Sequence, residues 1–121
     1  MTNPIFKLIK VGMDAGVVQH SLISNNIANA ETANYAGSKL DFDSYLKDAV
    51  SRRSMALART DQRHLPARQV TDITPYIRPT GPINIDAEMA DLARNTLTYH
   101  TFTEFMIREQ DMLKTAIKGG K

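Results

Sequence analysis

The chain has 121 residues, of which 42% are hydrophobic and 23% charged, which is enough for one domain and hardly for two. Its net charge of +2 is too small to indicate a polyanion partner by itself, and the absence of cysteine excludes disulfides and thiol chemistry. Lys7, Lys10 and Asp14 interrupt the apolar N-terminal stretch, which excludes a signal-peptide core or a membrane span there. If the protein leaves the cytoplasm, we expect a route that reads no cleaved leader.

The first 35 residues predict one long amphipathic helix. Apolar residues recur at spacings of three and four and form a heptad seam: Phe6, Ile9, Met13, Ile23 and Ile27. A second apolar stripe runs beside that seam: Leu8, Val11, Val18 and Leu22. Gly12 and Gly16 form a small-xxx-small pair at which another helix could approach closely, although two tolerated helical glycines are an equal alternative.

Residues 36–82 predict a basic and largely irregular or extended connection. They carry a net charge of +3 and four of the five prolines. Their one helix candidate runs from Phe42 to Arg53, and beyond it the prolines favour extended or turn structure. The alternative is that this segment folds back as a third helix and completes an ordinary bundle.

Residues 83–121 predict a second long helix. Its seam contains six large side chains: Met89, Leu92, Tyr99, Met106, Leu113 and Ile117. Its second stripe contains Phe102, Phe105 and Met112. Asp86 is a candidate N-cap, and the Gly119-Gly120 pair ends the helix.

Together these patterns predict an all-α fold in which the two terminal helices pair as an antiparallel coiled coil. Segments 1–35 and 83–121 would form one helical core domain, joined by segment 36–82. A two-helix hairpin buries one stripe of each helix and has no layer to cover the second. Because extended apolar surface usually marks an interaction site, we expect the second stripes to contact other subunits.

The sequence offers no support for catalysis, a cofactor, a metal or a small-molecule substrate. His20, His64 and His100 each stand alone, without a second ligand at helical spacing. His20 falls on the seam and is better interpreted as a packed or partner-facing histidine. Phosphate-binding loops, nucleophile elbows and dinucleotide fingerprints are absent from the sequence.

Nucleic-acid binding is the alternative function that the residues suggest. Five arginines lie within seventeen residues: Arg52, Arg53, Arg59, Arg63 and Arg68. The segment has no aromatic residue for base stacking, and neither long helix has a basic face. An arginine-rich loop can equally pair with acidic residues of a neighbouring subunit.

The stretch SNNIANAETANY, residues 24–35, places three asparagines in the last turns of the first helix, although asparagine is a poor helix former. Six of its residues resemble the N-terminal signature of the bacterial flagellar axial proteins, the rod, the hook and their relatives: Asn26, Ile27, Ala28, Asn29, Thr32 and Tyr35. The stretches LARTDQRHL (57–65) and NIDAEMADLARNTLTYHTF (84–102) resemble the proximal rod members of that family. The family usually has Pro-Gly where this chain has Ala33-Asn34. Asparagine tolerates a positive φ next best after glycine, so we expect the turn to be kept.

The resemblance implies a structural subunit of the proximal rod that assembles helically, with its terminal helices packed in the wall of a tube, and that is required for motility. The implied partners are further copies of the chain, other rod proteins, and the membrane-embedded MS ring and export-gate complex at the rod base. The implied location is the periplasmic rod of the basal body, reached through the flagellar type III secretion apparatus without a cleaved signal peptide. Nucleic acid is not among the implied partners.

In such a wall the three asparagines would be buried and would need hydrogen-bond partners. We therefore predict that Asn25, Asn26 and Asn29 set the register between subunits, with Asn29 the best placed to cap its own helix. Local C-capping by all three is the alternative. The candidate subunit contacts are Leu8, Val11, Val18, Leu22, Asn25, Phe102, Phe105, Met112, Arg52, Arg53 and Arg59.

Overall fold

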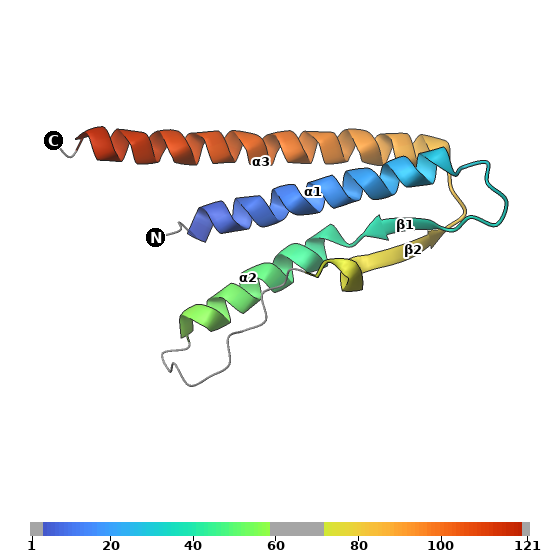
Figure 1. Cartoon of the computed structure of the whole chain (residues 1–121), viewed down its shortest axis with the longest axis horizontal. Coiled ribbons are helices and arrows are strands. Elements are labelled where there is room, and N and C mark those ends of the chain that lie inside the picture. The colour runs from blue at the N-terminus through green and yellow to red at the C-terminus, as the bar shows by residue number, and fades with distance from the viewer. Residues whose placement is uncertain (1–3, 59–71, 120–121) are drawn as a thin grey trace.

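The computed structural model describes residues 4–58 and 72–119 and contains three helices and a two-stranded sheet in that part of the chain (Figure 1). The elements follow in the order α1 (Pro4–Ala28), β1 (Gly37–Leu40), α2 (Phe42–Ala58), the short 3-10 helix η1 (Thr74–Tyr76), β2 (Ile77–Gly81) and α3 (Ile85–Gly119). The prediction of an all-α fold with two long terminal helices is therefore confirmed. None of the described helices is apolar over a stretch long enough to cross a bilayer.

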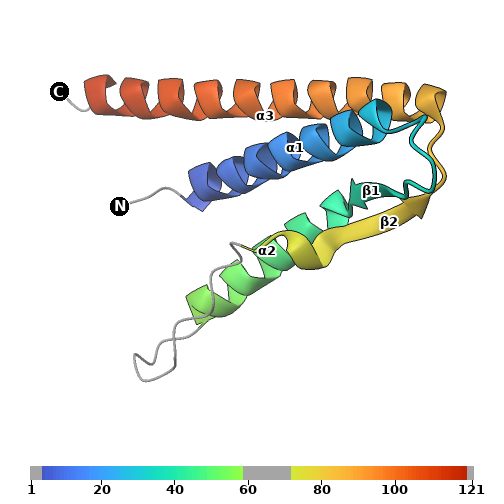
Figure 2. The same ribbon diagram turned by 45° about the vertical axis from the view of Figure 1, so that its right-hand side comes forward.

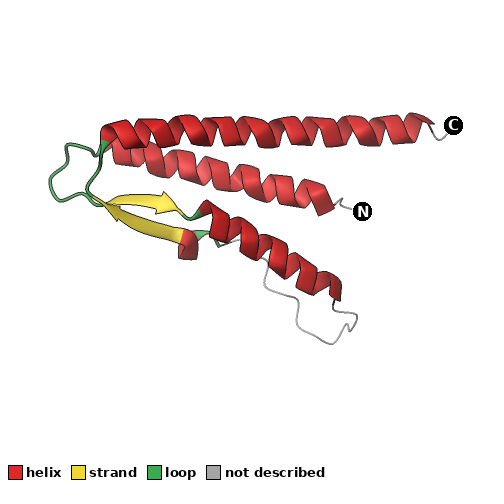
Figure 3. Cartoon of the chain, turned by 180° about the vertical axis from the view of Figure 1, so that it is seen from behind, coloured by secondary structure: helices red, strands yellow, loops and turns green. Residues whose placement is uncertain are grey.

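α1 and α3 form the antiparallel pair that the heptad seams predict, and α1 packs along α3 in every view (Figures 1 and 3). Gly12 and Gly16 make the close approach possible. A Cβ atom at Gly12 would lie 2.5 Å from the ring of Phe102, and one at Gly16 would lie 3.1 Å from Cδ2 of Tyr99. The helix that approaches this glycine pair is therefore α3 of the same chain.

The middle segment forms an antiparallel hairpin of β1 and β2, with Lys39 opposite Arg78 and Leu40 opposite Ile77. The expected extended structure is thus partly a sheet, although the sequence did not predict the pairing of these short strands. α2 begins at Phe42 as predicted and continues to Ala58. Asp41 caps this helix, because its carboxylate accepts hydrogen bonds from Ser44 Oγ at 2.8 Å and Ser44 N at 3.2 Å.

α1 is the central layer of the molecule, with α3 on one side and the hairpin and α2 on the other (Figures 1 and 2). α2 contacts α1 near its start and then diverges from it (Figure 2). α2 reaches α3 at its start, where Phe42 packs against Phe102 of α3, with 6.2 Å between the ring centroids. The arrangement is therefore not the three-helix bundle that the sequence left open.

β1, η1 and the start of α2 pack against α1 and form a small core with it. Ala15 of α1 is fully buried among Leu40, Tyr45 and Tyr76. The two tyrosine rings meet edge to face at 5.2 Å. Tyr76 also donates a hydrogen bond to Asp48 Oδ2 at 2.7 Å, which raises the pKa of its phenol.

The expectation that the second apolar stripe of α1 is exposed in the single subunit is wrong for two of its residues. Val11 and Leu22 pack against the core cluster of their own chain, so they are not free for a neighbouring subunit. Leu8 and Val18 are half-buried, and their role as subunit contacts stays a prediction.

Four of the α3 assignments are also wrong. Met89, Leu113 and Ile117, predicted on the seam, are 52%, 42% and 73% exposed, whereas Phe102, predicted as a surface contact, is half-buried against α1 and α2. A heptad series on a straight helix rotates by about 20° per heptad, so the series through Met89 starts outside the contact with α1.

Helix length explains the two remaining errors. α3 has 35 residues and α1 only 25, and at about 1.5 Å per residue α3 is roughly 15 Å longer. Residues 110–119 are all exposed and are called here the C-terminal overhang; they extend past the start of α1 (Figure 1). Leu113 and Ile117 belong to this overhang, where α1 no longer covers α3.

Candidate functional site

The asparagine motif lies at the end of the molecule where α1 ends, β1 begins and α3 starts, called here the closed end (Figure 1). Asn26 is its centre and is only 1% exposed. Its Nδ2 donates to the Ser38 carbonyl at 2.9 Å and to Glu88 Oε2 at 3.1 Å, and its Oδ1 accepts from Ser38 N at 3.0 Å. One side chain thus connects α1, β1 and α3.

Gln19, two turns before Asn26, completes this attachment. It is 7% exposed, and its Oε1 accepts a hydrogen bond from Leu40 N at 2.8 Å. Ser38 and Leu40 lie on the edge of β1 that faces away from β2, so the two side chains of α1 occupy the place of a third strand. An edge covered in this way cannot pair with another chain.

The rest of the motif forms the turn that leaves α1. Asn29 Nδ2 donates to the Asn25 carbonyl at 2.8 Å, and Thr32 Oγ1 donates to Asn29 Oδ1 at 3.2 Å. Asn29 therefore caps its own helix. Asn34 has φ of 61°, the positive value expected where the family usually has glycine. Tyr35 follows and is half-buried.

The position of Asn26 corrects one prediction about the asparagines. All of its polar atoms bond within the subunit, so it fixes the register between α1, the hairpin and α3 rather than the register between subunits. Asn25 is exposed, and its role as a subunit contact stays a prediction.

The start of α3 adds polar contacts that sequence reasoning missed. Asn84, rather than Asp86, caps the helix, since its Oδ1 accepts from Asp86 N at 3.0 Å. Lys39 of β1 pairs with Asp91 at 3.1 Å. Asn95, 9% exposed, donates from Nδ2 to the Gly16 carbonyl at 2.9 Å. The sequence feature that could have identified Asn95 is its position: it is a polar residue between Leu92 and Tyr99, on the face of α3 that packs against Gly12 and Gly16.

In contrast to the closed end, much of α3 presents apolar side chains to solvent. Phe105 and Met112 are 51% and 58% exposed, and Leu113 and Ile117 of the C-terminal overhang are 42% and 73% exposed. Within the described residues, no buried polar side-chain atom lacks a hydrogen-bond partner. In the described residues, the buried polar side chains therefore have hydrogen-bond partners, whereas several large apolar side chains of α3 remain exposed to solvent.

Comparison with known proteins gives the family. No family model matches the chain. It is 31% identical over 112 residues to the flagellar basal body rod protein FlgB of Bacillus subtilis (strain 168), an alignment that covers 86% of this chain and 85% of the relative. The chain belongs to the FlgB family.

Two further FlgB proteins align over a similar span. The protein from Cereibacter sphaeroides (strain ATCC 17029 / ATH 2.4.9) is 32% identical over 111 residues, which cover 84% of each chain. The protein from Aeromonas hydrophila is 29% identical over 106 residues, which cover 81% of this chain and 80% of the relative. This FlgB-family chain is therefore a structural subunit of the flagellar basal-body rod, and nothing supports the nucleic-acid alternative.

The arginine segment of this FlgB chain is only partly described. Arg52 is exposed on α2, whereas the side chain of Arg53 and all of Arg59, Arg63 and Arg68 lie outside the described residues. Their assignment as subunit contacts stays a prediction. His20 is exposed on α1 rather than packed in the seam. In the described part of the chain, no three His, Asp or Glu side chains are grouped so that they could hold a metal ion.

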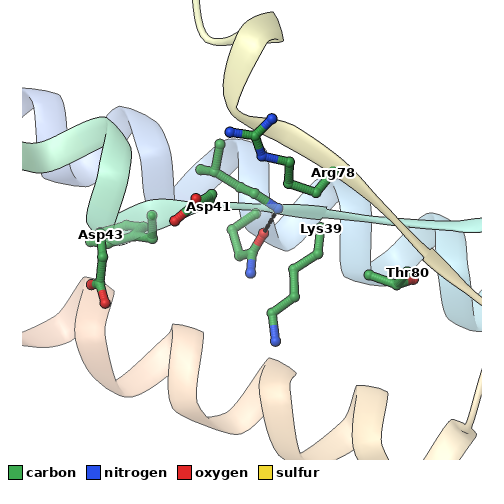
Figure 4. Close-up of a pocket in the computed structure, with 8 residues that line it drawn as sticks. Lys39, Asp41, Asp43, Arg78 and Thr80 are labelled. Atoms are coloured by element: carbon green, nitrogen blue, oxygen red, sulfur yellow. Dashed lines mark hydrogen bonds between the residues drawn. The ribbon is translucent and has the colours of Figure 1, made fainter. Parts of the chain in front are cut away.

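An open groove of about 420 Å³ lies beside the hairpin of this FlgB chain (Figure 4). It is lined by Gln19, Lys39, Leu40, Asp41, Phe42, Asp43, Arg78 and Thr80. Lys39 and Asp43 point toward α3 in Figure 4, and Arg78 points to the other side of the hairpin. The carboxylate of Asp41 is already bound to Ser44, whose two hydrogen bonds lower the pKa of Asp41. Lys39 is bound to Asp91, so the groove is a surface of mixed charge in which two charged groups, Lys39 and Asp41, are already paired.

Proposed function

We propose that this subunit assembles helically with further copies of itself in the proximal part of the rod, with the α1–α3 pair lying in the wall of the tube. The observation that carries the proposal is the apolar face of α3 around Phe105 and Met112, which no residue in the described part of the subunit covers. A monomer gains nothing from exposing such side chains, whereas burying each of them in an assembly stabilises it by about 1.5–3 kcal/mol.

The proposed core domain consists of residues 1–35 and 83–121, which contain α1 and α3. Segment 36–82 contains the hairpin and α2, and its described part forms an arm on the opposite side of α1 from α3. The polar contacts of Asn26 and Gln19 hold this arm to the helix pair. The arm would then enter the rod at one fixed orientation.

The proposed partners beyond further copies are the other rod proteins, and the MS ring and export-gate complex at the rod base. We further propose that the subunit reaches the periplasmic rod through the flagellar type III apparatus without a cleaved leader, that its role is mechanical rather than catalytic, and that motility requires it. Membership of a family of basal-body rod proteins supports this set of partners and this location.

The test of the proposal is Phe105→Asp, with Leu97→Asp as the matched control. Leu97 is 70% exposed and lies on another face of the same helix, so the two variants introduce the same charge into similar surroundings. We expect the Phe105→Asp subunit to fold and to be exported but to be missing from purified basal bodies, and its cells not to swim. Leu97→Asp should be incorporated. Motile cells with Phe105→Asp would refute the proposed assembly face.

A further inference from the structure

β2 is the outer strand of the hairpin, on the side of β1 that faces away from α1 (Figures 1 and 2). In an antiparallel pair, successive residues turn their backbone N–H and C=O groups alternately toward the partner strand and away from it. Ser38 and Leu40 of β1 turn theirs toward α1. Ile77 and Pro79 lie opposite these two residues, so they turn theirs to the free edge of β2. Another chain could add a strand at an edge of this kind.

The free edge of β2 lacks the donors that an added strand requires. Pro79 is exposed to solvent there, and a proline has no backbone N–H. The N–H of Ile77 donates to the Thr74 carbonyl and so closes η1. From Ile77 to Pro79, the edge therefore offers carbonyl oxygens but no available N–H group. A strand added at this edge could form only part of the usual hydrogen-bond ladder.

The far end of β2 is irregular as well. Ser38 pairs with Pro79, whereas Gly37 pairs with Gly81. Thr80 is therefore an extra residue on β2 and forms a β-bulge, which increases the local twist and interrupts pairing. Gly81 then has φ of 77°, outside the β region, and β2 ends there. The regular part of the free edge is thus confined to the first three residues of β2.

We infer that the free edge of β2 is closed to strand addition and that Pro79 is the residue that closes it. The hairpin then stays two-stranded, because Asn26 and Gln19 of α1 cover its other edge. Open sheet edges are templates for aggregation, and proline at an edge position is one of the features that prevent it. The inference depends only on contacts within one subunit, so it can hold whether or not the proposed self-assembly does.

Amide exchange in the full-length Pro79→Val variant, followed by NMR, tests the free edge directly. The variant places an N–H at position 79. We expect this amide to exchange at least about a hundredfold faster than that of Arg78, which faces Lys39 across the hairpin. In the unaltered protein, we expect slow exchange of the Ile77 amide, because it bonds to Thr74. A protected amide at position 79, or a freely exchanging Ile77 amide, would overturn the inference.

Self-association supplies the second measurement. In concentrated protein, Pro79→Val should increase the amount of thioflavin-binding aggregate about fivefold or more, as expected for one additional net hydrogen bond in each contact. The matched control is Pro82→Val, since Pro82 is also exposed but follows the end of β2, so that its new N–H lies outside the sheet. Equal amounts of aggregate from the two variants would overturn the assignment to Pro79.

Pro79→Lys keeps the test decisive if valine disturbs the fold, which circular dichroism of each variant reveals. Lysine restores the same N–H but adds a charge at an exposed edge position, where charge opposes strand addition. We expect the amide at position 79 to exchange as fast as in Pro79→Val, with several times less aggregate. As much aggregate from Pro79→Lys as from Pro79→Val would mean that association does not follow this edge, and the inference would fail.

Discussion

The closed end and the C-terminal overhang are the two ends of the same helix, α3, and they differ in how their contacts are satisfied. At the closed end, Asn26 is 1% exposed and bonds to Ser38 and Glu88 of its own chain. In the overhang every residue from 110 to 119 is exposed, including Ile117 at 73%. The closed end is therefore complete in one subunit, whereas the overhang has an apolar surface that none of the described residues covers.

This difference separates two kinds of register. The hydrogen bonds of Asn26, Gln19 and Asn95 fix how α1, the hairpin and α3 align within one chain, before any second subunit is involved. Buried polar groups are suited to this role because a shifted alignment leaves them without partners, at about 1–3 kcal/mol for each group. In the proposed assembly, the alignment between subunits would depend instead on apolar side chains such as Phe105 and Met112, which are 51% and 58% exposed and pack less selectively than buried polar groups.

Asn26→Leu should have the largest effect on the isolated subunit. It removes the partners of Ser38 N and of the Ser38 carbonyl, each at about 1–3 kcal/mol of unfolding free energy. Urea denaturation gives the loss, and amide exchange at Ser38 should accelerate. The control is Asn25→Leu, which alters the exposed neighbour and should change the stability by less than about 0.5 kcal/mol. Equal losses from the two variants would mean that the Asn26 bonds do not hold the closed end together.

Gly12→Ala should have the next largest effect, a loss of about 1–2 kcal/mol in unfolding free energy. The added methyl group would lie 2.5 Å from the Phe102 ring, and Phe42 packs against that ring. Gly119→Ala is the control, because no atom lies within 4 Å of its added carbon. Thermal melts should rank the two variants, and Phe102→Leu should recover part of the loss in the Gly12 variant. No recovery would show that the clash with the ring is not the cause.

Asn34→Gly should stabilise the subunit by about 0.5–1 kcal/mol, because it relieves a non-glycine residue in the left-handed region. Asn34 has φ of 61°, and the family usually has glycine at this position. Asn34→Ala should destabilise the turn by a similar amount. The two variants are compared by urea midpoint. If glycine lowers the midpoint, the side chain of Asn34 contributes more than its backbone strain costs.

Ile117→Ser should have the smallest effect on the isolated subunit, within about 0.5 kcal/mol, although it removes a large apolar side chain. The side chain is 73% exposed, so little packing is lost. The contrast is Ile23→Ser on α1, where the side chain is 1% exposed and the loss should be several times larger. A cooperative loss of stability with Ile117→Ser would show that the overhang is packed within the subunit after all.

The sequence predicted the helices well because their signals are local. Apolar spacing and Gly119 predicted α3, Phe42 was the predicted start of α2, and the Ala33-Asn34 departure predicted the positive φ of Asn34. The strands were harder to predict, because β1 has four residues and β2 five, with Pro79 inside β2. The pairing of two such short segments depends on the surface of α1 beneath them.

The partners of the polar side chains could not be read from the sequence. Asn26 meets Glu88 across 62 residues, and Asn95 meets Gly16 across 79. The sequence identified Asn26 as important but favoured a contact between subunits, because the family resemblance implied a packed wall in which its amide would be buried. The hairpin receives that amide within the subunit, and Val11 and Leu22 are partly buried against the core cluster beside it.

The sequence by itself determined the two long helices, their antiparallel pairing and the turn after α1, since each depends on spacing and backbone preferences within a few residues. Only the tertiary structure decided which stripe of each helix is buried. A heptad seam fits a straight helix for only a few turns, and burial then depends on what lies opposite. Val11 packs against the core cluster and Phe102 packs against α1, whereas no described residue covers Leu113. The sequence already predicted helices of unequal length, and α3 is ten residues longer than α1. Only the positions of the helix ends in space show that this difference leaves the end of α3 exposed.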